Sequence, residues 1–139
     1  MKPVDLSPVL AVENLSVSFR TEEGRRHVVD GVSLSIRSGE AVAIVGESGS
    51  GKSVTLLAAM GVLPPTAMIK ADAITLNGED IVGATDARLA TLRGTEISMV
   101  FQNPMASLNP TMRIGEQVSE TVAVHDSNAS QEALTALAG

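Results

Sequence analysis

An eight-residue glycine-rich segment limits the folds open to this chain more than any other feature. Residues 46–53 read Gly-Glu-Ser-Gly-Ser-Gly-Lys-Ser, which matches the phosphate-loop pattern G-x-x-x-x-G-K-[ST] in full. That pattern requires a buried strand before it and a helix after it. Residues 41–45 are five consecutive apolar residues, which is typical of a parallel strand buried on both faces. Residues 54–60 predict the helix, and Gly61 and Pro64 would end it.

The fixed positions of this segment each have a chemical role. Its glycines allow a tight turn, so that backbone N–H groups can approach phosphate oxygens. Lys52 would place a positive charge beside the β- and γ-phosphates, and the Ser53 hydroxyl could bind Mg²⁺. The positive end of the helix dipole would face the same phosphates. A flexible linker is the alternative, but a linker needs neither the lysine nor the apolar run before it.

The composition limits the kind of core and the kind of partner. The chain has 139 residues, enough for one small domain, and 44% of them are hydrophobic. Phe19 and Phe101 are the only aromatic residues, so the core must be aliphatic. A net charge of −6 argues against nucleic acid as the main partner, because nucleic-acid-binding domains usually carry a basic face. No cysteine is present, which excludes disulfides and cysteine metal sites within these residues.

The chain shows no sequence signal for a membrane. Its first residues lack the apolar centre of a signal peptide, and no apolar stretch approaches the ~20 residues that span a bilayer. We therefore expect any membrane association to come through a partner.

Local patterns predict further elements along the chain. Apolar or alternating runs favour strands at four more places: residues 9–19, 28–36, 73–76 and 96–101. Asp30-Gly31 would form a bulge in the second of these, and Asn77-Gly78 favours a tight hairpin after the third. Capping residues and helical spacing predict three further helices: residues 85–92, residues 114–124 and a last one that begins near Ser130.

Two segments beyond the loop complete a wider pattern. They are Phe101-Gln102-Asn103-Pro104 and Ser107-Leu108-Asn109-Pro110. Together with the phosphate loop and the strand Val12–Phe19, they make residues 9–124 resemble the N-terminal part of an ABC transporter ATP-binding subunit, of the oligopeptide, dipeptide and nickel import group. The resemblance implies an α/β fold, with a partly parallel P-loop NTPase core, an antiparallel β-subdomain and the start of a helical subdomain. Residues 1–8 would be a tail and residues 9–139 the N-terminal part of the ATP-binding domain.

The resemblance also implies ATP and Mg²⁺ as cofactors and assigns roles to individual residues. Phe19 would stack on adenine, although a core phenylalanine at a strand end is the alternative. Gln102 and Lys52 would be catalytic, and Gln102 would share Mg²⁺ with Ser53. The remaining nucleotide contacts would come from the loop, partly through backbone N–H groups: Gly46, Glu47, Ser48, Gly49, Ser50, Gly51 and Val54.

The implied function is the ATP-binding component of an importer for peptides or a related small solute. Such a component works at the cytoplasmic face of the membrane. Its partners would be permease subunits, a second ATP-binding subunit and, indirectly, an extracytoplasmic solute-binding protein. No nucleic acid is implied.

The sequence departs from the family pattern in ways that bear on activity. The signature Leu-Ser-Gly-Gly-Gln segment, the Walker B Asp-Glu and the switch histidine are not found in these residues. Because the Asp would organise Mg²⁺ and the Glu would polarise water, we expect nucleotide binding with little hydrolysis by this chain alone. Asn103, where the family usually has Asp, should matter little. Two alternatives remain, a stand-alone P-loop kinase or NTPase and a non-enzymatic fragment or partner-binding piece.

Overall fold

The computed structural model describes residues 7–102 and 108–125, and the chain divides into two units, Met1–Ala90 and Thr91–Gly139. The first unit carries the sheet and the phosphate loop. The helix α2 (Asp86–Leu92) runs across the boundary, and α3 (Ile114–His125) belongs to the second unit.

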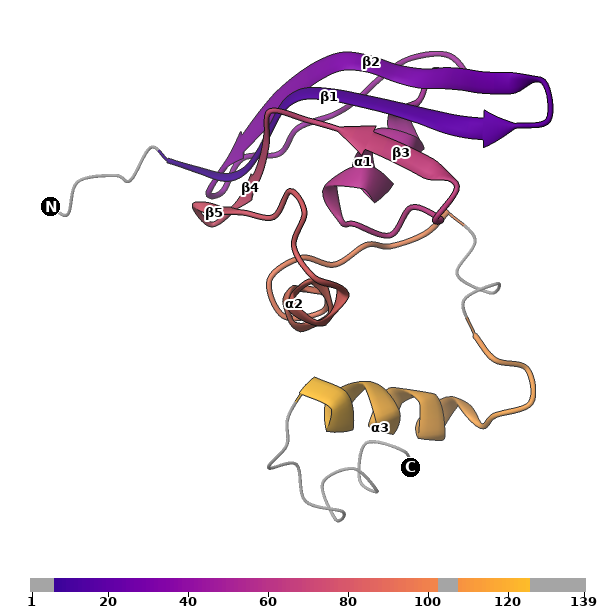
Figure 1. The fold of residues 1–139 in the computed structure, drawn as a ribbon. Coiled ribbons are helices and arrows are strands. Elements are labelled where there is room, and N and C mark those ends of the chain that lie inside the picture. The colour runs from indigo at the N-terminus through magenta and orange to yellow at the C-terminus, as the bar shows by residue number, and fades with distance from the viewer. Residues whose placement is uncertain (1–6, 103–107, 126–139) are drawn as a thin grey trace, which may run out of the picture. The chain divides into compact units, whose positions relative to one another are not determined.

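The first unit is built on an antiparallel sheet whose centre is its first strand. Its strands are β1 (Pro8–Thr21), β2 (Gly24–Arg37), β3 (Ala67–Lys70), β4 (Ala73–Leu76) and β5 (Glu79–Asp80). The strand order is β2-β1-β4-β5, and β3 also pairs with β1, beside β4. Figure 1 shows the long β1–β2 hairpin with β3 and β4 along the other edge of β1. The strands predicted over residues 9–19 and 28–36 are therefore confirmed, and they pair as an antiparallel hairpin before the loop.

A bulge interrupts the β1–β2 ladder where the sequence predicts one. Gly31 has a φ of 62° and lies in β2 opposite Ser16, whereas Asn14, whose φ of 51° is also left-handed, lies in a second irregularity of β1 opposite Ser33. Two side-chain hydroxyls replace ladder bonds here: the Asn14 amide donates to Ser33 Oγ (2.9 Å) and the Gly31 amide donates to Ser16 Oγ (3.0 Å). These two amides therefore stay hydrogen-bonded where the ladder is interrupted.

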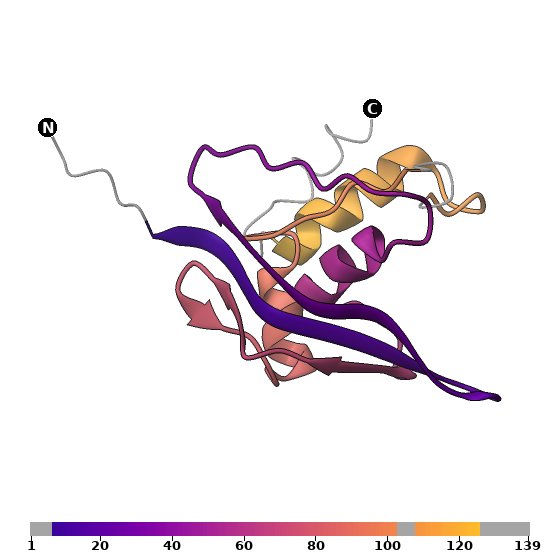
Figure 2. The same ribbon diagram turned by 90° about the horizontal axis from the view of Figure 1, so that it is seen from above.

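The core of the first unit is aliphatic, as the composition predicts. Val12, Leu15 and Val17 of β1 are its largest fully buried side chains. The helix α1 (Lys52–Ala59) buries Thr55, Ala58 and Ala59, and it contacts β1 and β2. Figure 2 shows α1 beside the β1–β2 hairpin, with its axis running across the direction of the two strands. This packing holds the end of the phosphate loop against β2.

The strand predicted over residues 41–45 does not form. These residues have no strand hydrogen bonds, and Val45 is 89% exposed. A strand of a parallel sheet needs a hydrogen-bonded neighbour, and no described residue pairs with this segment. The prediction of a strand here was therefore wrong for this structure.

The strand predicted over residues 96–101 is also wrong. The segment makes only an isolated bridge, between Ile97 and Arg93, and Val100 is 93% exposed. Every pairing between the strands that the structure describes is antiparallel, so the parallel part of the expected core is not seen in them.

The shorter elements follow their local signals. Asn77 and Gly78 have φ values of 49° and 83°, as a tight hairpin between β4 and β5 requires. The Thr85 hydroxyl accepts a hydrogen bond from the Arg88 amide (3.3 Å) and caps α2. The β3 strand was not predicted, and the helix expected near Ser130 lies outside the described residues.

In the second unit, α3 matches the helix predicted over residues 114–124. Gln117 ties the preceding loop to this helix. Its Nε2 donates to the carbonyl oxygens of Asn109 and Met112, both at 3.1 Å, and its Oε1 accepts from the Asn109 amide at 2.9 Å. Among the described residues, none of the helices has the length and apolar character needed to cross a membrane.

Candidate phosphate-binding site

The glycine-rich loop takes a conformation that only glycine adopts easily. Gly49 and Gly51 have φ values of 82° and 89°, in the left-handed region, and Gly51 is the N-cap of α1. A Cβ on Gly51 would lie 2.8 Å from the carbonyl oxygen of Val28 and 3.1 Å from Cγ2 of Val29. The start of α1 is therefore in close contact with β2, and this contact leaves no space for a side chain.

The lysine of the loop is held by the loop itself. Its ammonium donates hydrogen bonds to the carbonyl oxygens of Gly46 (2.7 Å) and Glu47 (2.6 Å) and to Ser50 Oγ (3.2 Å). These bonds join the start of the loop to its end. Two of these acceptors are carbonyl oxygens, whose partial negative charge would repel a phosphate. The hydrogen bonds hold both oxygens against the lysine ammonium.

Several backbone amides of the loop remain available. The Ser50 amide donates to the Glu47 carbonyl (3.3 Å), but in the described part of the chain the amides of Gly49, Gly51 and Ser53 donate no hydrogen bond. The first turn of α1 is fixed by Thr55, whose amide and hydroxyl both bond to the Gly51 carbonyl, at 2.9 and 3.1 Å. Free amides at a helix N-terminus form an anion site.

A cavity of about 200 Å³ lies beside these groups. It is lined by Val28, Gly49, Ser50, Gly51, Lys52, Ser53 and Val54. The loop supplies the polar atoms, and two valines supply an apolar wall. Another hollow in the same unit, of about 210 Å³, is lined only by aliphatic residues and glycines, so it offers no charged side chain to a phosphate.

The residues present fit a magnesium-bound phosphate group. One ammonium, a set of free amides and the exposed Ser53 hydroxyl lie within nine consecutive residues. An exposed hydroxyl can bind Mg²⁺ without breaking a bond inside the protein. Predicted site residues 46–54 are therefore brought together by the loop and the first turn of α1.

Two predicted residues lie outside this arrangement. Phe19 is half-buried on β1, where its strand partners are Arg26 on β2 and Ala67 on β3, and it does not line the cavity. Gln102 is exposed and belongs to the second unit. The roles of Phe19 and Gln102 therefore stay predictions.

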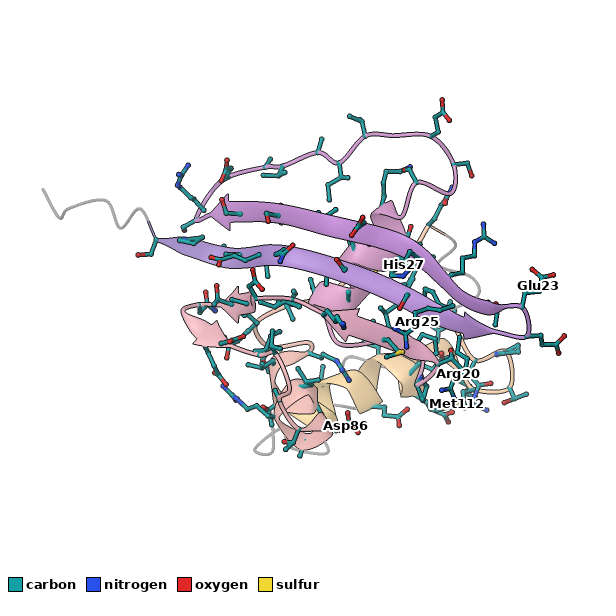
Figure 3. All side chains as sticks on the ribbon, turned by 45° about the horizontal axis from the view of Figure 1, so that its top comes forward. Arg20, Glu23, Arg25, His27, Asp86 and Met112 are labelled. Carbon is teal, nitrogen blue, oxygen red and sulfur yellow. The ribbon has the colours of Figure 1, made fainter. Side chains whose placement is uncertain are left out.

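The residues next to Phe19 along the hairpin lie near its turn. Figure 3 shows that Arg20 and Arg25 lie at the same turn end of the hairpin as Glu23.

Val28 is the lining residue that the sequence patterns did not identify. It is the extra residue of a bulge, because Val17 pairs with Val29 and the next residue, Ser18, pairs with His27. No spacing in the sequence connects Val28 to a loop more than twenty positions later. Only the packing of α1 on β2 brings the two together.

Comparison with known proteins places these features in a family. The ABC transporter family model matches residues 29–139. The oligopeptide transport ATP-binding protein OppD of Bacillus subtilis (strain 168) is 42% identical over 124 residues, which cover 88% of this chain and 35% of the relative. OppD of Salmonella typhimurium is 44% identical over 131 residues, which cover 94% of this chain and 39% of the relative. The dipeptide transport ATP-binding protein DppD of Bacillus subtilis (strain 168) is 45% identical over 121 residues, which cover 86% of this chain and 36% of the relative.

The lengths of these relatives differ greatly from the length of this chain. The chain spans between 35% and 39% of each of the three relatives.

Proposed function

The chain belongs to the ABC transporter family, and on that basis we propose that it is the nucleotide-binding part of an importer's ATP-binding subunit. The transported solute would be an oligopeptide or a dipeptide, as in the names of the relatives, or another small solute of this kind. The phosphate loop carries this proposal, because Lys52, free amides and an exposed hydroxyl converge beside one cavity.

In this proposal the loop binds the β- and γ-phosphates of ATP. The Lys52 ammonium and the amides of Gly49, Gly51 and Ser53 supply positive charge and hydrogen-bond donors. The Ser53 hydroxyl would hold Mg²⁺, which neutralises phosphate charge when it is bound. Phe19 would stack on the adenine, and Gln102 would contact Mg²⁺ near the attacking water.

The whole subunit would couple ATP to transport at the cytoplasmic face of the membrane. It would pair with a second ATP-binding subunit and act on permease subunits, which in turn receive solute from an extracytoplasmic binding protein. For the 139 residues alone we propose binding with little hydrolysis, because no Walker B Asp-Glu and no signature segment occur among them.

Substitution of the loop lysine tests the binding site directly. Lys52→Ala should weaken MgATP binding about tenfold to hundredfold, because charged hydrogen bonds to phosphate are lost. The measurement is isothermal titration calorimetry of MgATP into the 139-residue protein. Lys70→Ala is the matched control, since it removes an exposed lysine of β3 and should leave the dissociation constant unchanged.

Equal affinity of the wild type and Lys52→Ala would contradict the phosphate-loop assignment. The far-UV circular dichroism spectrum of each variant shows whether it keeps the fold. Phosphate release measured on the same samples separates the remaining alternatives. Turnover that depends on Lys52 would favour a stand-alone NTPase, and a folded protein without any binding would favour a non-enzymatic piece.

A further inference from the structure

We propose that the Ser50 hydroxyl competes with phosphate for the Lys52 ammonium and so lowers the affinity of the loop for nucleotide. The inference rests on the proposed function. A lysine ammonium has three N–H donors. All three have partners in the loop: the carbonyl oxygens of Gly46 and Glu47 and the hydroxyl of Ser50. A phosphate oxygen can therefore accept from Lys52 only if one of these bonds weakens.

The bond to Ser50 is the one that gives way. The two carbonyl bonds are 2.7 and 2.6 Å long, whereas the bond to Ser50 Oγ is 3.2 Å long. Hydrogen bonds weaken with length, and a charged phosphate oxygen is a stronger acceptor than a neutral hydroxyl. The carbonyl oxygens also belong to the backbone, so their release would require the loop to change shape. The serine needs only a rotation about its Cα–Cβ bond.

The position of Ser50 supports the same exchange. A Cβ on Gly46 would lie 2.8 Å from Ser50 Oγ, so the hydroxyl lies closely against the start of the loop. Ser50 and Lys52 both line the cavity beside the free amides. The Ser50 amide donates to the Glu47 carbonyl at 3.3 Å, which holds the backbone in place while the side chain rotates.

The test is the dissociation constant of MgADP and MgATP for Ser50→Ala, measured by isothermal titration calorimetry. Removal of one neutral competing hydrogen bond should tighten binding of both nucleotides about two- to tenfold. Ser35→Ala is the matched control, because it removes an exposed hydroxyl from β2 and should change nothing.

Ser50→Cys provides a second variant if Ser50→Ala does not fold, because a thiol is a weak acceptor and should also tighten binding. Unchanged or weaker binding by the folded Ala or Cys variant, with normal binding by the wild type, would overturn this inference and leave the proposed function standing. Absence of binding by the wild type would overturn both.

Discussion

Two glycines of the phosphate loop have the same backbone conformation but different surroundings. Gly49 and Gly51 both lie near a φ of 85°, at 82° and 89°. A side chain on Gly49 would meet no atom within 4 Å, whereas one on Gly51 would collide with the Val28 carbonyl. The first glycine is therefore needed only for its dihedral angle. The second is needed also because α1 contacts β2 at that point.

Alanine substitutions should separate these two requirements. Gly49→Ala should cost about 1–2 kcal/mol of unfolding free energy, since only the left-handed backbone is strained. Gly51→Ala should cost about 2–4 kcal/mol, because the collision with β2 adds to the same strain. Urea unfolding followed by far-UV circular dichroism measures both, as the chain has no tryptophan or tyrosine. Equal losses in the two variants would mean that the loop does not press on β2.

At the scale of elements, one ion pair ties β5 to the start of α2. Arg88 Nε donates to Glu79 Oε1 at 2.9 Å, and Arg88 Nη2 donates to Glu79 Oε2. This hydrogen bonding, with a smaller contribution from the charge of Arg88, lowers the pKa of Glu79 from its ordinary value of 4.5. Both side chains are nearly half exposed, so solvent screens the attraction. The pair fixes geometry more than it adds stability.

The lowered pKa sets the pH range over which this pair acts. In the unfolded chain Glu79 titrates near 4.5, and in the folded chain it titrates lower, so the stabilisation is complete above the unfolded value. This stabilisation is lost as the pH falls through the pKa that Glu79 has in the folded chain. Glu79→Gln should therefore lower the melting temperature at neutral pH, and this difference from the wild type should shrink in acid.

Thermal unfolding followed by circular dichroism measures that difference. It is recorded at neutral pH and at a pH below the range in which carboxyl groups titrate. Glu22→Gln in the β1–β2 turn is the control and should change neither melt, because that side chain is exposed and makes no ion pair within the described residues. A Glu79→Gln difference of the same size at both pH values would contradict the account.

At the scale of the whole first unit, stability comes from the antiparallel sheet and not from the strand expected before the loop. Leu15 of β1 is fully buried beneath its neighbours, whereas Val45 is 89% exposed. Val42 and Ile44 are also exposed, at 45% and 39%. Consecutive apolar side chains in water favour association, so this segment contributes apolar surface without contributing to the core.

Two substitutions test where the core lies. Leu15→Ala should cost about 2–5 kcal/mol of unfolding free energy, because it leaves a cavity at the centre of the sheet. Val45→Thr should change it by less than about 0.5 kcal/mol, as expected of an exposed position. Urea unfolding measures both values. A large loss for Val45→Thr would mean that residues 41–45 are buried after all.

Local signals account for the parts that the sequence predicted correctly. The left-handed Asn77-Gly78 turn, the Thr85 cap and the glycines of the phosphate loop depend on dihedral angles and hydrogen bonds within a few residues. Such preferences act wherever the segment is placed. The turn geometry of the glycine-rich loop could therefore be predicted from the sequence, whereas the binding of phosphate by its residues stays a prediction.

Long-range pairing decided the rest. An apolar run becomes a strand only when another segment satisfies its N–H and C=O groups, and residues 41–45 have no such partner among those described. The sequence of β3 has a weaker strand pattern than residues 41–45. It forms a strand because β1, about fifty positions earlier, pairs with it. Val28 reaches the loop in the same way, through contacts between segments that are distant in the sequence. By itself the sequence determined the phosphate loop, whereas only the tertiary structure decided which strands pair and what lies against the loop.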